Sequence, residues 1–270
     1  MILEDTLRET IERRSVRAVA RVGSYDGPHP WAGSIPQLLV VDRKVSEATR
    51  ELRGGVVFHL FPYDVLELGG FPTGLLAEAR IEYDPTRLLH RQQNSMATMD
   101  AGLLKEQAQK ILKDLPLNRQ ADLIHALLVS REVFLSHVVP LHMPPEQMFL
   151  SECRYPEYLQ NRLSLSSPRI LGALDELFAL RHPEEAPALL AATRGLSLTQ
   201  QEKRARIAVE AGFRQGSIFY LRQESVKVHR EALKQWTHLP ATRRERLSQL
   251  WGLEHAPLGW VAVNLVRELL

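Results

Sequence analysis

The chain has 270 residues and a mass of 30.7 kDa, enough for one large domain or two small ones that each bury a core. Its hydrophobic fraction of 44% and charged fraction of 24% are near the globular average, which excludes a disordered, collagenous or fibrous chain. With 34 Lys and Arg against 32 Asp and Glu residues, the net charge of +2 excludes a uniformly cationic nucleic-acid-binding protein.

Cysteine use and the N-terminal sequence predict a cytoplasmic protein. Cys153 is the only cysteine, so one chain can form neither a disulfide nor a cysteine-based zinc site, and we expect this thiol to be buried as a small hydrophobic group. The first residues, MILEDTLRETIERR, alternate apolar and charged side chains too early for a signal peptide. No run approaches the roughly 18 apolar residues of a membrane span, so we expect no membrane association.

The first hundred residues mix helix and strand patterns. Strands are predicted at 16–23, 38–42, 56–62 and, as a sheet edge, 79–84. Helices are predicted at 2–11, 46–53 and 63–69. A loop rich in Gly and Pro at 23–34 separates the first two strands, and Gly54–Gly55 is expected to end the second helix. The continuous apolar run of the second strand predicts burial on both of its faces.

From Ala101 onward the pattern is helical. Helix breaks are expected at Pro116, Pro140, Pro144, Pro145, Pro168, Pro183, Pro187 and Pro240. Apolar residues at steps of three and four between Leu123 and Val138 predict one core-facing helix. The apolar segment 257–270 predicts a C-terminal helix that docks into the bundle or joins two copies of the chain. The predicted fold is therefore α+β, with a mixed-sheet domain at 1–96 and an all-α domain at 97–270.

Four features of residues 16–84 carry a family resemblance. A strand ends in Gly23-Ser24 and a loop of ten residues follows, before the strand string SIPQLLVV (34–41). The strand VVFHLFP (56–62) precedes the predicted helix YDVLELG (63–69), and a later stretch contains ARIEYDP (79–85). Together they resemble the nucleotidyltransferase superfamily, the polymerase-beta-like fold that includes kanamycin and minimal nucleotidyltransferases. The resemblance implies that fold for the N-terminal domain.

The acids of that family's metal site are absent from the chain. A Gly-Ser turn can hold a nucleotide phosphate because Gly permits close approach of the backbone. In the family, two carboxylates at alternate positions of the next strand and a third from a neighbouring strand hold paired Mg²⁺ ions about 3.5–4 Å apart. Ile35, Gln37 and His59 stand at these three positions. Ile has no donor atom and a Gln carbonyl is a weak neutral ligand, so we expect no catalytic residue, no metal and no Mg²⁺ cofactor here.

Three functions follow from this reading. We expect a degenerate, inactive nucleotidyltransferase-like protein that binds a nucleotide or nucleic acid as a regulatory module, with Gly23, Ser24 and Asp26 at the nucleotide. One alternative is an active nucleotidyltransferase that transfers a nucleoside monophosphate with a Mg²⁺ site relocated to Asp26. Asp42 is unsuited to that role, because it would lie about 16 Å from Gln37 at the usual strand rise. The other alternative is a DNA- or RNA-binding protein of repair or stress response.

The last alternative depends on a basic section at 194–246, which holds twelve Lys and Arg residues against five Glu. Its candidate phosphate-binding residues are Arg204, Arg206, Arg243, Arg244 and Arg246. The same charges are equally typical of solvated helix faces, because Arg and Lys are common at exposed helix positions.

Two further patterns carry little information. Helical domains beside nucleotidyltransferase domains sometimes resemble HEPN ribonucleases, in which an Arg and a His lie four to six residues apart on a helix. Arg131 with His137 and Arg119 with His125 fit this spacing, but the Arg and His content alone predicts about three accidental matches. Three tryptophans are expected in the core, with base stacking as the alternative; they are Trp236, Trp251 and Trp260.

Overall fold

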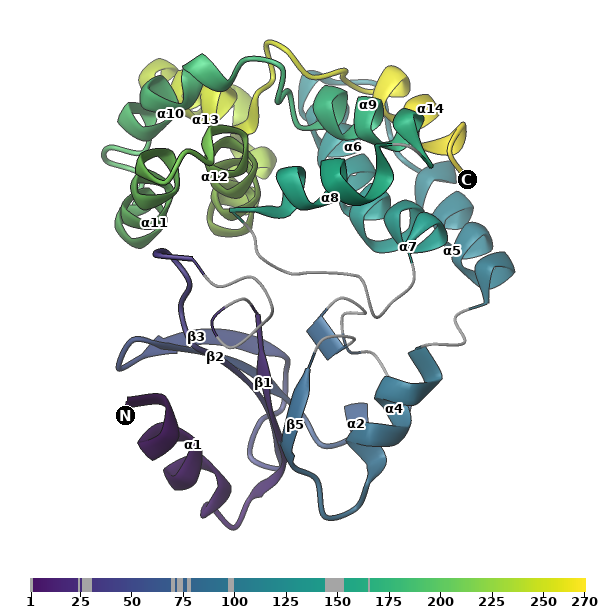
Figure 1. The fold of residues 1–270 in the computed structure, drawn as a ribbon. Coiled ribbons are helices and arrows are strands. Elements are labelled where there is room, and N and C mark those ends of the chain that lie inside the picture. Colours follow the sequence, from purple (N-terminus) through teal and green to yellow (C-terminus); the bar gives the residue numbers. More distant parts are fainter. Residues whose placement is uncertain are drawn as a thin grey trace. The chain divides into compact units, whose positions relative to one another are not determined.

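The computed structural model describes residues 2–23, 25, 31–68, 71, 75–76, 79–96, 100–143, 153–164 and 166–270. The chain forms two compact units, Met1–Asp100 with Met143–Ser151, and Ala101–His142 with Glu152–Leu270. Figure 1 shows that the first unit contains the strands and that the second is helical. The α+β fold class predicted from the sequence is therefore confirmed.

A five-stranded mixed sheet forms the centre of the first unit, with strand order β3-β4-β2-β1-β5. The strands are β1 (Val16–Val22), β2 (Gln37–Asp42), β3 (Thr49–Arg53), β4 (Val56–Phe61) and β5 (Arg80–Tyr83). β2 and β4 run parallel, and the other neighbouring pairs are antiparallel. The four predicted strands are confirmed within one or two residues, and β5 lies at an edge as expected.

The predicted helix at 46–53 is wrong, because Thr49–Arg53 forms the edge strand β3. Its side chains are mostly exposed, so the alternation of apolar and polar residues that marks a half-buried strand is missing. Gly54 and Gly55 both have positive φ, +57° and +81°, and join β3 to β4 in a two-residue hairpin. Glycines at both central positions are typical of the tight turns that match strand twist. The glycine pair therefore makes a turn and does not end a helix.

Helices cover both faces of the sheet, which explains the uninterrupted apolar sequence of β2. One face packs against α1 (Ile2–Ile11), whose Leu3 and Leu7 meet Leu38 and Val40 of β2. The opposite face contains Leu39 of β2 and residues of α2 (Val65–Leu68) and α4 (Leu88–Met96). In Figure 1, α1 and the α2–α4 pair accordingly lie on opposite sides of the sheet. All described side chains of β2 except that of Asp42 are buried.

The second unit is built from helices alone in its described part. They are α5 (Ala101–Lys113), α6 (Gln120–Val133), η1 (Phe134–Val138), α7 (Val139–His142), α8 (Tyr155–Leu163), α9 (Pro168–Leu177), η3 (Pro183–Glu185), α10 (Ala186–Ala192), α11 (Thr199–Glu210), α12 (Arg214–His229), η4 (Arg230–His238), α13 (Ala241–Trp251) and α14 (Trp260–Arg267). Prolines stand at the start of several helices, as at Pro168 and Pro183, where a missing N–H is tolerated.

One expected break is absent: the helix from Gln120 continues through Pro140 to His142. The π-helical turn η1 lies directly before the proline and widens the helix where the proline ring would clash with a carbonyl one turn earlier. The continuous helix is long and apolar enough to cross a membrane by length and composition, which the sequence analysis did not anticipate. However, 67% of its apolar window is buried inside the protein, as in a core helix.

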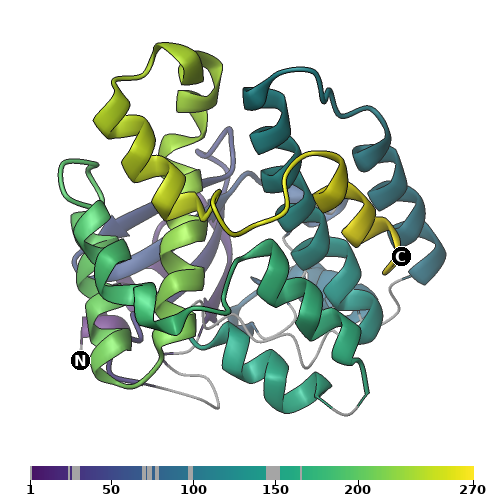
Figure 2. The ribbon, with the colours of Figure 1, turned by 90° about the horizontal axis from the view of Figure 1, so that it is seen from above.

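The C-terminal helix α14 docks into the helical unit, as the sequence predicted. Ala262, Val263 and Val266 are buried, and Arg267 Nη2 donates to the carbonyl of Leu112 at 3.0 Å. α14 packs against α6, and the view from above in Figure 2 shows this yellow helix beside the teal helices. Trp260 is exposed with the Arg267 guanidinium 4.9 Å from its ring, so its predicted core position is wrong.

Candidate functional site

The turn after β1 and the start of β2 bring together two of the residues singled out in the sequence. Gly23 follows β1 with φ +79°, a conformation that L side chains rarely adopt. Gln37 begins β2 and pairs with Val22 across the two strands. A Cβ added to Gly23 would lie 2.6 Å from Gln37 Nε2, so only glycine leaves room for this amide.

His59 joins Gln37 from the neighbouring strand β4. The two strands are parallel and His59 pairs with Leu39, which places Gln37 and His59 on the same face of the sheet. Gln37 is buried, and its Oε1 lies 2.8 Å from His59 Nε2. In this pair the imidazole N–H donates and the amide oxygen accepts. Gly23, Gln37 and His59 therefore form one cluster, which we call the Gln37 cluster.

The Gln37 cluster is chemically unlike a magnesium site. Its only oxygen ligand of the side-chain type, Gln37 Oε1, already accepts the imidazole hydrogen bond, and neither side chain is a carboxylate. Ile35, half-buried just before β2, adds no donor atom. Asp42 ends β2, where its Oδ1 accepts the backbone N–H of Lys44 at 2.9 Å, so it lies at the opposite end of the strand from Gln37. Ser24 and Asp26 lie outside the described residues.

Among the described residues, no group of three His, Cys, Asp or Glu side chains converges on a point that could hold a metal ion. The acidic side chains near β1 are engaged with a cation: Glu4 and Glu82 both form ion pairs of 2.8 Å with Arg21. In its described part the cluster presents hydrogen-bond donors of neutral groups, which suit the oxygen atoms of an anion better than a cation.

The arginines of the basic section do not form one phosphate-binding surface. Arg204 on α11 is only 3% exposed and its guanidinium lies 5.1 Å from the ring of Tyr220, so it is a core residue. Arg206, on the same helix, pairs with Glu202 at 2.7 Å. On α13, Arg246 donates to the carbonyl of Arg194 at 2.5 Å.

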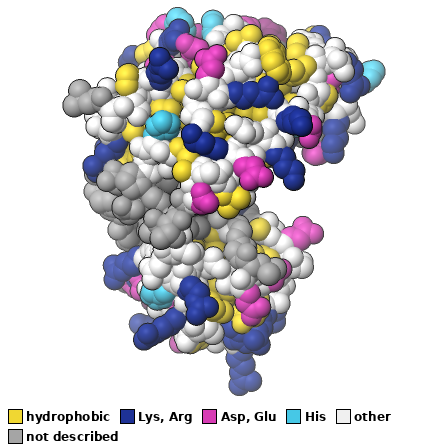
Figure 3. Space-filling model, turned by 90° about the vertical axis from the view of Figure 1, so that its right-hand side faces the viewer, with side chains coloured by type: hydrophobic (Ala, Val, Ile, Leu, Met, Phe, Trp, Pro, Cys, Tyr) yellow, Lys and Arg dark blue, Asp and Glu magenta, His cyan; other side chains and the backbone are white. Residues whose placement is uncertain are grey.

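Arg243 and Arg244, also on α13, are the two basic candidates whose side chains reach solvent without a described ion pair. Figure 3 shows another face of the molecule, on which Lys and Arg side chains are interspersed with acidic and apolar ones. Interspersed charges of this kind are typical of solvated helix surfaces.

The HEPN-like spacings lead to two different places. Arg131 is buried and donates from Nε to the carbonyl of Leu177 at 2.6 Å, and burial lowers the pKa of His137. Arg119 and His125 both line a cavity of about 380 Å³ between the start of α6 and η4. Arg119 is the N-cap residue of α6, and its backbone N–H donates to Asp122 at 3.0 Å.

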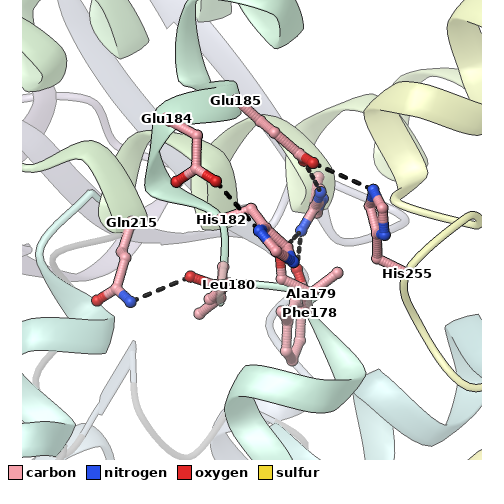
Figure 4. A network of polar contacts seen from close by, with 9 residues as sticks. Phe178, Ala179, Leu180, His182, Glu184, Glu185, Gln215 and His255 are labelled. Carbon is pink, nitrogen blue, oxygen red and sulfur yellow. Dashed lines mark hydrogen bonds and ion pairs between the residues drawn. The ribbon is translucent and has the colours of Figure 1, made fainter.

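A buried arginine pair was missed in the sequence. Arg222 on α12 donates from Nη1 to the carbonyls of Phe178 and Ala179, the latter at 2.5 Å, where α9 ends near the bond from Arg131 to Leu177. Its Nη2 lies 3.8 Å from Glu185, a carboxylate that His255 also contacts at 3.1 Å (Figure 4). The signal available was the apolar string SIFYL directly before Arg222, which is unusual for an exposed arginine.

The other single residues agree with expectation. Cys153 is buried. Trp236 and Trp251 are buried and stacked, with ring centroids 5.4 Å apart, so both belong to the core as predicted.

Comparison with known proteins gives one structural likeness. No family model matches the sequence, and no curated protein matches it either. The chain is similar to a solved structure described as a nucleotidyltransferase-like protein from Exiguobacterium sibiricum 255-15, with 12% sequence identity and a TM-score of 0.27. The match covers 93% of this chain and 88% of that chain. At this level the likeness carries no conclusion about ligand or activity, which depend on the residues of this chain.

Proposed function

We propose that the sheet unit is a nucleotidyltransferase-like domain that recognises a phosphate-bearing ligand at the Gln37 cluster without a metal ion and without nucleotidyl transfer. The observation that carries the proposal is the hydrogen bond of 2.8 Å between Gln37 and His59 at positions where the family resemblance implies metal-binding carboxylates. A neutral amide–imidazole pair cannot supply the negative charge that a hard Mg²⁺ site requires.

The glycine supports binding of an anion beside this pair. The positive φ of Gly23 lets the backbone turn sharply after β1, and the missing side chain leaves the backbone open to close approach. A phosphate held at such a turn receives hydrogen bonds from backbone N–H groups, and an imidazole adds a donor that can also become cationic. The cluster thus has the properties of a phosphate-binding turn that needs no bound cation.

The test measures the affinity for a fluorescent ATP analogue in Mg²⁺ and again in EDTA. We expect equal affinity in both buffers and no Mg²⁺-dependent transfer of labelled nucleotide to protein, RNA or a small acceptor. Gln37→Ala and His59→Ala should each weaken binding roughly tenfold, about the effect of one hydrogen bond to a charged ligand. His90→Ala is the matched control, because His90 belongs to the same unit but contacts Asp84.

Two outcomes would contradict the proposal. Nucleotide transfer that requires Mg²⁺ and disappears in Asp26→Ala would establish the active alternative with a relocated site. Absence of nucleotide binding in both buffers, with circular dichroism showing an intact fold, would mean that the Gly23 turn serves only to connect β1 and β2.

A further inference from the structure

Arg131 and Arg222 are buried at the same place in the helical unit, with exposed fractions of 4% and 1%. Arg131 extends from α6 and Arg222 from α12, and both guanidinium groups bind carbonyls of the segment Leu177–Ala179. The C-terminus of a helix carries partial negative charge, so these contacts favour cations at the end of α9. They account for part of the hydrogen-bonding capacity of the two side chains.

The remaining capacity is unused among the described residues. Nη1 and Nη2 of Arg131, and Nε of Arg222, are buried and have no hydrogen-bond partner there. A guanidinium carries five N–H donors, of which Arg131 uses only the one on Nε. Leaving several donors of a charged group buried and unpaired is strongly unfavourable, so a missing acceptor is the expected explanation.

The local charge points to an acceptor that is an anion. Within the described part of the unit, the carboxylate ion-paired with these arginines is Glu185, 3.8 Å from Arg222 and shared with His255. Burial, together with the nearby Arg222, lowers the pKa of Arg131 well below its ordinary value. Two buried guanidinium groups therefore share one distant carboxylate, and an additional negative charge would stabilise both.

A cavity of about 90 Å³ opens at this point between α6 and α12. Arg131, Arg222 and Phe178 line it, and the Arg131 guanidinium lies 5.1 Å from the Phe178 ring. Since a water molecule needs only about 10–15 Å³ of such space, the cavity has room for a tetrahedral oxyanion or several waters. Lys227 and Glu132 also line it; Lys227 pairs with Glu224 at 2.6 Å and Glu132 with Arg230 at 2.7 Å.

We propose that this cavity binds a small oxyanion, either inorganic phosphate or the phosphoryl group of a larger ligand, through the unpaired donors of Arg131 and Arg222. Lys227, which is 53% exposed, adds positive charge at the cavity. A bidentate contact from a planar guanidinium to two oxygens of one phosphoryl group is the geometry for which arginine is best suited. The site belongs to the helical unit alone and is independent of the function proposed for the sheet unit.

The experiment follows thermal unfolding in sodium phosphate and in sodium chloride at equal ionic strength. Phosphate should raise the Tm of the wild type, with saturation, and chloride should not, because a ligand that binds only the folded state stabilises it by mass action. Arg131→Met, similar in length but uncharged, should lose the phosphate response. Lys227→Met should weaken phosphate affinity two- to fivefold, the usual range for a partly exposed charge pair. Lys203→Met is the matched control, an exposed lysine on α11 that does not line the cavity.

Each result decides the proposal. Equal unfolding of the wild type in both salts, or an unchanged phosphate response in Arg131→Met, overturns it. If Arg131→Met does not fold, the comparison of Lys227→Met with Lys203→Met decides instead, and equal responses of the two overturn the proposal. A crystal structure in phosphate with ordered water only at Arg131 Nη1 and Nη2 also overturns it.

A further arm identifies the source of the phosphoryl group. The Tm response is measured for inorganic phosphate and for ATP in the wild type and in Gln37→Ala. A response to ATP that survives Gln37→Ala but not Arg131→Met supports a phosphoryl ligand in this cavity. A response confined to inorganic phosphate supports the free ion. Loss of the ATP response in Gln37→Ala alone bears on the sheet unit and leaves the phosphate result to decide the cavity.

Discussion

A Cβ on Gly23 would lie 2.6 Å from Nε2 of Gln37, so the turn after β1 and the first residue of β2 are packed as closely as a glycine allows. Gly55 has nearly the same φ, +81°, with nothing within 4 Å of its added Cβ. The two glycines therefore separate backbone strain from steric contact.

Gly23→Ala should consequently destabilise the protein more than Gly55→Ala. Both substitutions carry the cost of a left-handed conformation, roughly 1–2 kcal/mol, and only the first also displaces the Gln37 amide. Urea unfolding of the two variants measures the difference. Equal midpoints would mean that Gln37 moves aside freely.

The Gln37–His59 hydrogen bond should show energetic coupling in a double-mutant cycle. We expect about 1 kcal/mol of coupling between Gln37→Ala and His59→Ala, the usual net value of one hydrogen bond. Strict additivity of the two unfolding free energies would show that the contact is energetically neutral.

Neutralising Arg243 and Arg244 tests the nucleic-acid alternative. If the basic section binds DNA or RNA, the double variant should weaken gel shifts at low salt and reduce the salt dependence of binding by about two phosphate contacts. Arg206→Ala is the control, since Arg206 is already ion-paired with Glu202. If the wild type gives no shift at low salt, the section is a solvated surface.

Stability should depend on the protonation of His137. Burial lowers the pKa of His137 from its ordinary value of 6.5, so the unfolded chain binds a proton that the folded protein disfavours. The protein should therefore lose stability as the pH falls below about 6.5, until the pH passes the lowered pKa. His137→Asn, which does not titrate, should lose less stability between about pH 8 and pH 5. Parallel Tm curves for the two proteins would contradict this.

The exposed side of α14 is where two copies of the chain would meet if the C-terminal helix forms an oligomer. Val261 is 63% exposed there, next to the exposed Trp260. Val261→Asp should convert a dimer to a monomer in analytical ultracentrifugation, whereas Val228→Asp, an exposed valine on α12, should not. A wild type that sediments as a monomer at all concentrations would exclude this interface.

The sequence predicted those elements whose own residues carry the pattern. β2 and β4 are apolar because both faces of their sheet are covered, and α14 is apolar because it docks on α6. β3 was missed because it pairs along one edge only and has no buried face, so its residues resemble those of a surface helix.

The candidate site was predictable only in part. Gly23, Gln37 and His59 were identified by position, and the parallel register of β2 and β4 brings the last two together. The burial of Arg131, Arg204 and Arg222 could not be derived from spacing, because it results from packing between helices distant in the chain. Charge counting alone had assigned Arg204 to a surface that it does not reach.

The polar sequence of β3 has a consequence for how the sheet behaves in concentrated solution. An edge strand leaves unpaired backbone groups that can recruit a strand of another molecule. Thr49, Arg50 and Arg53 project exposed polar and cationic side chains along this edge, and a second β3 brought alongside would oppose like charges. The strand that looks least like a strand thereby protects the sheet from intermolecular pairing and aggregation.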